Sequence, residues 1–345
     1  MDKELRDISW QVSEPEYRAD SALSYSTLAR FEREGFNKLD KLFESVSTQS
    51  LTEGSAVDAI ITGGEEEFNR NFVVLDLNIT DSGKEICNKL YEKYSFYTSF
   101  SEIPQNIVSD VAKEVGFWKA DKWDKKRYSA VLETGDVEDY FYYLLNSDKT
   151  ILDTATYEKI LGMVRTLRES PSTARYFATD DIFSTVRRYY QLKFKATLEG
   201  VDYRCMADLI LVDYKKKIIY PCDLKTSSHT EWDFQDSFKQ WQYMIQARLY
   251  WRIIRANLDN DPYFKNFTLE NYRFIVVNSQ KLTPLVWEFP LTKYKGTLVD
   301  DRGYEYRDPF EIGSELKEYL DTKPSVPKGI VITGLNQITC LHPKE

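Results

Sequence analysis

The chain has 345 residues, of which 42% are hydrophobic and 29% are charged, and its formal net charge is −9. This composition is that of an ordinary globular protein with a large core, and the acidic balance argues against a surface that coats nucleic acid broadly. No apolar run reaches the roughly 18 residues of a membrane-spanning helix, and the first residues lack the apolar core of a signal peptide. We therefore expect no contact with a membrane and a cytoplasmic protein. The cysteines form no Cys-x-x-Cys pair, which favours reduced thiols: Cys87, Cys205, Cys222 and Cys340.

The N-terminal part of the chain predicts two helices after a polar segment. Residues 1–20 are expected to form a loose arm. The range from Ser24 to Leu42 is predicted to be a helix, with Ser24 or Ser26 as its N-cap, although these serines could do more than cap. The range from Leu51 to Ile61 is predicted to be a second helix that ends at the glycine pair following it.

The next segment is helical and rich in aromatic residues. Residues 72–77 could form a short strand, and residues 81–176 then show a helical pattern. Aromatic side chains at such spacing are more often core residues, but they could also stack on unpaired bases. Lysines at 119–126, together with Arg127, form one of several local basic clusters that could contact DNA despite the acidic total. The others are Arg187 and Arg188, Lys193 and Lys195, Arg204, and Lys215 to Lys217.

Residues 187–226 predict a three-stranded meander that brings polar residues into one row. A turn at Glu199-Gly200 would place Gln191 opposite Asp208. A turn centred on Lys215-Lys216 would place Asp208 opposite Asp223, with their β-carbons roughly 5 Å apart. Lys225 lies two positions beyond Asp223 and therefore points to the same face.

This row predicts a site for a cation. An aspartate pair in a hairpin is more often a solvated edge, but here the flanking strands are apolar on both faces. Two buried carboxylates repel each other unless a cation lies between them, and buried charge without compensation is costly. Asp208 and Asp223 beside Lys225 are the groups that metal-assisted phosphodiester hydrolysis requires.

The C-terminal third predicts a long helix, two strands and a final helix. The range from Trp232 to Leu258 has apolar residues at helical spacing, and Gln242, Gln246 and Tyr250 would share one stripe. The ranges Tyr272 to Asn278 and Leu285 to Phe289 are predicted strands. Glu311 to Leu320 is predicted to be a helix, followed by a Pro-rich tail.

Several of these segments together resemble a known family. Asp208, separated by 14 residues from Asp223-Leu224-Lys225, is similar to the PD-(D/E)XK nuclease signature. Asp223-Leu224-Lys225-Thr226 resembles the RecB- and RecE-like exonuclease branch in particular. Three further segments resemble that branch in the same order: the serine-containing helix at 24–31, the segment Gly54 to Ile61, and the Gln246-x-x-x-Tyr250 helix. The resemblance covers roughly residues 20–290.

The resemblance implies an α/β fold with a restriction-endonuclease-like core, whose mixed, mostly antiparallel central sheet is flanked by helices. The nuclease domain would span 20–300 with a helical insertion at 81–176, and 301–345 would form a C-terminal helix and tail. Mg²⁺ or Mn²⁺ would be held by Asp58, Asp208, Asp223 and the carbonyl oxygen of Leu224, since hard oxygen ligands suit these ions. Catalytic roles would fall to Lys225, Asp208, Asp223, Gln191, Gln246 and Tyr250, the last two of which would contact the DNA backbone or position water.

The chain departs from the family at two positions. Relatives usually have histidine where Asp58 stands, and many have glutamate where Gln191 stands. The aspartate keeps a metal-binding role but adds negative charge, which the neutral amide would offset.

The resemblance implies a metal-dependent exonuclease that processes duplex DNA ends in recombination, as phage enzymes of this kind do. A single-strand annealing protein could be its partner, and it could form a homo-oligomer. Two alternatives stay open: a structure-specific or single-strand endonuclease on the same fold, and an inactive module that binds DNA or protein.

Overall fold

The computed structural model describes residues 3–43, 48–179, 184–290, 296–299, 303, 305–322, 331–332 and 338–339. The chain divides into two compact units. The first comprises Met1–Thr62 and Gly162–Glu345, and the second comprises Gly63–Leu161. Most of the Pro-rich tail, including Cys340, lies outside the described residues.

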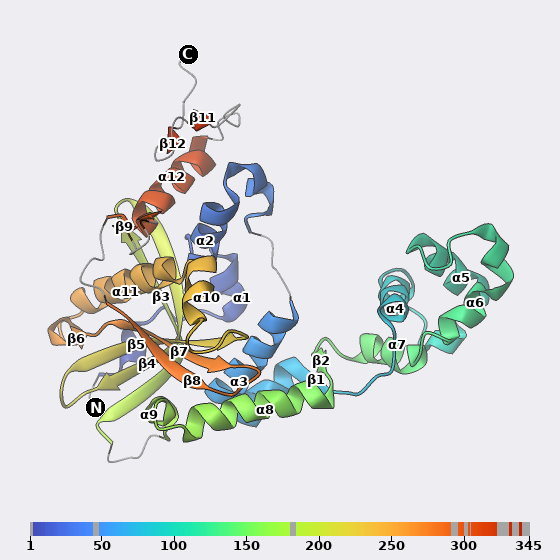
Figure 1. Cartoon of the computed structure of the whole chain (residues 1–345), viewed down its shortest axis with the longest axis horizontal. Helices are drawn as coiled ribbons and strands as arrows, with labels where there is room; N and C mark the ends of the chain where they lie inside the picture. Colours follow the sequence, from blue (N-terminus) through green and yellow to red (C-terminus); the bar gives the residue numbers. More distant parts are fainter. Residues whose placement is uncertain are drawn as a thin grey trace. The chain divides into compact units, whose positions relative to one another are not determined.

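The first unit is built on a six-stranded mixed sheet with the order β3-β4-β5-β7-β8, in which β6 also pairs with β5 (Figure 1). Its strands are β3 Val186–Leu198, β4 Val201–Asp213, β5 Ile218–Ser227, β6 Thr268–Leu269, β7 Tyr272–Asn278 and β8 Pro284–Phe289. The pairs β3–β4, β4–β5 and β7–β8 are antiparallel, whereas β5 runs parallel to β6 and β7. The expected α/β class with a mixed, mostly antiparallel sheet is therefore confirmed.

The register of the meander is also confirmed. Glu199 and Gly200 form the β3–β4 turn with φ of 52° and 82°, the left-handed geometry of a tight hairpin. Leu198 pairs with Val201, and Leu192 pairs with Ala207, as the predicted turn requires. In the second hairpin, Asp213 pairs with Ile218 and Leu209 with Cys222, which centres that turn on Lys215-Lys216.

Helices cover both faces of the sheet. On one face α11 (Tyr243–Asp259) contacts β3, β4 and β7, and α2 (Tyr25–Glu34) and α12 (Pro309–Thr322) pack against it (Figure 1). The buried face of α11, which includes Ile245, Leu249 and Ile253, joins sheet residues in one large hydrophobic core. On the other face, the first part of α3 (Gln49–Asn71) and α9 (Ala174–Phe177) line a pocket together with sheet residues.

Three helix predictions were wrong in extent. The long helix predicted from Trp232 consists of α10 (Phe234–Gln240) and α11, which are separated where Gln242 adopts a left-handed φ of 60°. The predicted stripe therefore loses Gln242 and keeps Gln246 and Tyr250.

The other two differ at glycines. The first predicted helix is α2 followed by a 3-10 turn, η2 (Phe36–Lys41), because Gly35 has a φ of 65°. In contrast, α3 continues past Gly63 with a kink at Gly64, where φ is 68°, and ends only at Asn71.

The N-terminal segment is packed and does not form the expected loose arm. It contains η1 (Leu5–Ile8) and α1 (Glu14–Ala19), and the side chain of Leu5 is fully buried. The backbone N–H of Trp10 donates to the carbonyl of Lys193, which attaches the segment to β3. Sequence polarity concealed this because only a few apolar residues anchor the segment.

The second unit is helical, with a core of its own. It contains α4 (Asp81–Tyr94), α5 (Gln105–Glu114), α6 (Asp124–Leu132) and α7 (Val137–Asn146), and a two-stranded parallel pair of β1 (Phe72–Val74) and β2 (Thr150–Leu152). The short 3-10 turns η3 (Phe100–Glu102) and η4 (Asp121–Trp123) connect these helices. Its core includes Ile86, Val108 and Phe141, which are fully buried.

The division lies at 63–161, whereas the sequence placed the insertion at 81–176. The residues after 161 belong to the end of α8 (Thr154–Glu169) and to α9, and they bond to the first unit. Arg168 donates to the carbonyl of Ile60, and Arg188 of β3 donates to the carbonyl of Tyr176.

The remaining elements are short: η5 (Phe264–Asn266), β9 (Leu298–Val299), β10 (Glu305–Tyr306), β11 (Val331–Ile332) and β12 (Ile338–Thr339). Among the described residues, no helix is both long and apolar enough to cross a membrane. Cys87, Cys205 and Cys222 are buried free thiols.

Candidate active site

The site lies where β4 and β5 separate. Their pairing ends at Leu209–Cys222, one position before Asp208 and Asp223, and β5 continues beside β7 instead. Asp208 takes over the role of a strand partner, because its Oδ2 accepts the backbone N–H of Leu224 at 3.0 Å. The two acids are thus neighbours across a fork in the sheet.

Asp223 is held on both carboxylate oxygens. Its side chain is almost completely buried, with a relative exposure of 1%. Oδ1 accepts a hydrogen bond of 2.5 Å from Nε2 of Gln246, which α11 supplies. Oδ2 forms an ion pair with the ammonium group of Lys225. Both contacts fix the carboxylate on the face of the sheet that α11 covers.

Lys225 is a largely buried cation between acids and aromatic rings. Its ammonium nitrogen lies 5.0 Å from the ring centroid of Tyr243, a distance at which the ring stabilises positive charge. Burial alone would lower the pKa of Lys225, but Asp223, Tyr243 and Asp208 outweigh it, and the pKa lies above its usual range. The side chain is therefore a hydrogen-bond donor and a fixed positive charge at neutral pH.

The pKa of Asp208 is strongly shifted by its surroundings. Burial, and then the carboxylates of Asp223 and Asp58, raise its pKa well above the usual range, despite the opposing effects of Lys225 and the Leu224 N–H. One buried ammonium group thus faces three carboxylates, which is an excess of negative charge. Such a cluster binds either a proton or a further cation.

Asp58 reaches the site because α3 approaches β5 closely. A β-carbon at Gly54 would lie 3.1 Å from Oγ1 of Thr226, which is tighter than ordinary contact. Asp58 follows one helical turn later on the same side of α3. Asp58 and Leu224 line one pocket with Asp208, Leu209, Tyr190, Ile275, Ile61, Thr62 and Phe177.

Gln191 is attached to Asp58 by an unusual backbone geometry. Its φ is 53°, in the left-handed region, although pairing in β3 resumes on both sides at Tyr190 and Leu192. Nε2 of Gln191 donates to Oδ2 of Asp58 at 2.6 Å. The expected row across three strands is therefore interrupted. Gln191 is not paired with Asp208, nor Asp208 with Asp223, and the Gln191 amide is turned toward α3.

Two amide oxygens in this region have no hydrogen-bond donor among the described residues. They are Oε1 of Gln191 and Oε1 of Gln246, and both are buried. A buried acceptor without a donor is costly, so each indicates a place for a water molecule or a cation.

Tyr250 lies deeper than a DNA-contacting residue would. It is 8% exposed, and its ring packs edge-to-face on Tyr272 with centroids 6.1 Å apart. Burial raises the pKa of Tyr250 well above its usual range, so the phenol stays protonated. The geometry favours a role within the core of the site over contact with a DNA backbone.

Two tyrosines belong to the site that sequence reasoning did not select. Tyr243 begins α11 and lies beneath the Lys225 ammonium group, and Tyr25 begins α2 and packs against Tyr243 at 6.3 Å between centroids. The Tyr25 hydroxyl donates to the carbonyl of Trp241. Tyr25 lies within the serine-containing segment on which the resemblance rests, so the sequence did offer a reason to assign it to the site.

The cluster offers oxygen donors of the hard kind that Mg²⁺ prefers. In the described part of the chain, no group of three or more His, Cys, Asp or Glu side chains is gathered as closely as a full protein ligand shell requires. Mg²⁺ needs only one or two carboxylates and keeps several waters. The negative excess around Asp208 and the two unsatisfied amide oxygens match that demand.

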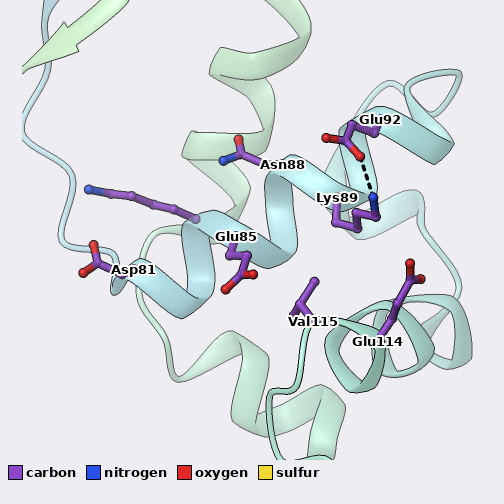
Figure 2. Close-up of a pocket in the computed structure, with 8 residues that line it drawn as sticks. Asp81, Glu85, Asn88, Lys89, Glu92, Glu114 and Val115 are labelled. Carbon is purple, nitrogen blue, oxygen red and sulfur yellow. Dashed lines mark hydrogen bonds and ion pairs between the residues drawn. The ribbon is translucent and has the colours of Figure 1, made fainter. Parts of the chain in front are cut away.

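A second hollow lies in the helical unit and is chemically different. Figure 2 shows it between α4 and the end of α5, lined by Asp81, Lys84, Glu85, Asn88, Lys89, Glu92, Glu114 and Val115. Two of its carboxylates are paired with lysines, Glu92 with Lys89 at 2.8 Å and Glu114 with Lys93. Its lining mixes acidic, basic, amide and apolar side chains and does not indicate one kind of ligand.

Comparison with known proteins gives little more. No family model matches the chain, and no curated protein is similar to it. Among solved structures, the chain is similar to a "Putative exonuclease" from Eubacterium rectale, with 14% sequence identity over 91% of this chain and 87% of that chain and a TM-score of 0.45. At such a TM-score, neither the fold nor the function of this chain follows from the likeness.

Proposed function

We propose that the chain is a deoxyribonuclease that requires Mg²⁺ or Mn²⁺ and hydrolyses phosphodiester bonds from duplex DNA ends. The observation that supports this most is the buried cluster of Asp208, Asp223 and Lys225 at the fork between β4 and β5. A structural ion pair would need one acid, whereas this cluster has a surplus, and burial together with the neighbouring acids raises the pKa of Asp208. We propose DNA ends as the substrate because the sequence resembles the RecE-like exonucleases.

The metal would be held by Asp58, Asp208, Asp223 and the Leu224 carbonyl. Since no three acids among the described residues are gathered closely enough for a ligand shell, binding would have to draw these carboxylates together. When bound, such a cation lowers the pKa of a coordinated water and neutralises charge on the phosphate. Gln246 and Gln191 would act as positioning residues, since their amide groups orient Asp223 and Asp58.

Lys225 would stabilise the phosphate rather than accept a proton. Beside Asp223 and Asp208 in the metal-free protein, its pKa is raised and the ammonium group stays charged, which favours charge stabilisation over proton abstraction. Placed beside Asp223, it can donate to a phosphate oxygen whose negative charge increases during attack. Tyr243 would hold the ammonium group in place through its ring face.

The test compares linear with covalently closed duplex DNA, with Mg²⁺ and with EDTA, for the wild type and Lys225→Ala. Lys317→Ala is the matched control, because Lys317 is an exposed lysine on α12 that pairs with Asp321 and belongs to none of the basic clusters. We expect the wild type and the control to degrade only linear DNA and only with Mg²⁺. We expect Lys225→Ala to lose at least about a hundredfold in rate, the size of one lost electrostatic contact to a transition state.

The other outcomes identify the alternatives. Cleavage of the closed circle would assign an endonuclease on the same fold. Absence of hydrolysis with either Mg²⁺ or Mn²⁺ would favour the inactive binding module. Sedimentation of the protein alone and with a single-strand annealing protein would test for a homo-oligomer and for that partner.

A further inference from the structure

The helical unit carries a cluster of three aromatic rings at the edge of its core, in which Phe117 and Trp123 are partly buried and Trp118 is exposed. Trp118 is 40% exposed, although it belongs to the most hydrophobic residue types. Its indole stacks on Phe117 with an interplanar angle of 14°, and it lies 5.0 Å from the ring of Trp123. The three rings form a supported surface rather than three independent side chains.

The backbone under Trp118 is held in a strained conformation. Its φ of 45° lies in the left-handed region, which disfavours every residue with a β-carbon. Arg127 maintains this geometry from below. Its guanidinium group is 1% exposed and donates to the carbonyl of Trp118 from Nε at 3.1 Å and from Nη2 at 3.0 Å. It also donates to the carbonyl of Ala120. The hydrogen bonds from the buried arginine thus hold the strained backbone in the conformation that leaves the indole at the surface.

Lysines surround these rings. Lys119, Lys122, Lys125 and Lys126 are all exposed. The two acids of this segment are already engaged, Asp121 with Lys113 and Asp124 with Arg127. The ammonium group of Lys122 lies 5.0 Å from the Trp123 ring centroid, and no ion pair is recorded for these four lysines among the described residues.

We propose that this aromatic–lysine platform (Phe117, Trp118, Trp123 and the four lysines) binds single-stranded DNA. The platform gathers positive charge on a chain whose net charge is −9, so charge complementarity selects a polyanion. An exposed indole supported by its neighbours adds a surface on which unpaired bases can stack. A duplex has no free base faces to place there, because its bases are already stacked on each other. The platform belongs to the second unit and the acidic cluster to the first, and binding to the platform needs no metal.

The experiment measures the anisotropy of a fluorescein-labelled oligothymidylate titrated with the full-length protein in EDTA. EDTA prevents hydrolysis, so failure of the proposed nuclease activity would not affect the result. We expect tighter binding to the single strand than to a duplex of equal length. Trp118→Ala should weaken single-strand binding by about tenfold, as the loss of one stacked base does.

A second substitution separates binding from folding. Trp118→Gly removes the ring and suits the left-handed backbone, so the loop keeps its shape. It should weaken binding as much as Trp118→Ala does. Tyr142→Ala is the matched control, since Tyr142 is 62% exposed on the same unit but follows Glu138 and Asp139 in α7.

The lysines predict a salt dependence. Each phosphate neutralised on a single strand contributes about −0.7 to the slope of log affinity against log salt. Lys119→Ala with Lys125→Ala and Lys126→Ala should therefore reduce that slope by roughly 2. Wild-type affinity in both Trp118 variants, or equal binding of duplex and single strand, would overturn the proposal.

Discussion

Gln191 has an unfavourable backbone conformation within β3 but gains a hydrogen bond to a residue of the candidate site. A left-handed φ costs a residue with a β-carbon about 1 kcal/mol, and glycine avoids that cost. Here the conformation turns the amide toward Asp58, to which it donates at 2.6 Å.

The cost of this conformation can be measured directly. Gln191→Gly and Gln191→Ala both lose the hydrogen bond to Asp58, but only glycine relieves the backbone. We expect the glycine variant to be the more stable by about 1 kcal/mol in urea unfolding, the reverse of the usual order within a strand. An alanine variant of equal or greater stability would show that the backbone at 191 is not strained.

Asp208 predicts a pH-dependent stability in the metal-free protein. Its pKa is raised by burial and by Asp223 and Asp58, so the folded state binds this proton more tightly than the unfolded state does. Stability is therefore lost as the pH rises from about 4, the unfolded value, through the raised folded value.

Asp208→Asn should remove that loss. The side-chain carbonyl of the introduced asparagine can still accept the Leu224 N–H, but it carries no charge. In EDTA the variant should equal the wild type below about pH 4 and exceed it at neutral pH by about 1 kcal/mol or more. Urea unfolding across this range checks the prediction, and a variant less stable than wild type at neutral pH would contradict it.

At the scale of elements, the position of α3 depends on one glycine. Gly54 allows the helix to approach Thr226 of β5, and Asp58 follows one turn later. Gly54→Ala should push α3 away, displace Asp58 and lower Mg²⁺-dependent hydrolysis by about tenfold, the effect of a displacement of a few tenths of an ångström at a reacting centre.

A compensating change tests the cause. Thr226→Ala removes the Oγ1 atom that the new β-carbon would meet, so Gly54→Ala with Thr226→Ala should recover most of the rate. Thr226→Ala alone is the control and should retain most of the activity. If the double variant stays as slow as Gly54→Ala, the helix is not positioned by this contact.

The sequence predicted some elements much better than others. The two hairpins were predictable in register because each turn is short and carries its own signal, Glu199-Gly200 in the first and the lysines around Lys215-Lys216 in the second. The break between α10 and α11 was not predictable, since Gln242 carries no local signal for a left-handed backbone. The contact of Lys225 with Tyr243 was not predictable either, since the two residues lie on different elements and nothing local links them. Asp58 could be placed only through the resemblance, because nothing local links it to residues far along the chain.

At the scale of the whole molecule, the two units have separate cores. Phe141 is fully buried in the core of the helical unit. Phe141→Ala should destabilise that unit by about 3–5 kcal/mol through the cavity it leaves. Hydrogen exchange followed by mass spectrometry should show faster exchange in residues 63–161, with unchanged protection in β4 and β5. Equal loss of protection in both units would show that they unfold together.

The hydrogen bond between Gln191 and Asp58 has a consequence for the order of folding. The two residues are 133 positions apart in the chain, and residues 63–161 lie between them. Closing a flexible loop of that length costs more entropy than closing a short one. If the helical unit folds first, most of that loop becomes a rigid body and less disorder remains to be lost. The folded insertion would then lower the entropy cost of bringing Asp58 and Gln191 together, so that the two parts of the acidic cluster meet more readily during synthesis.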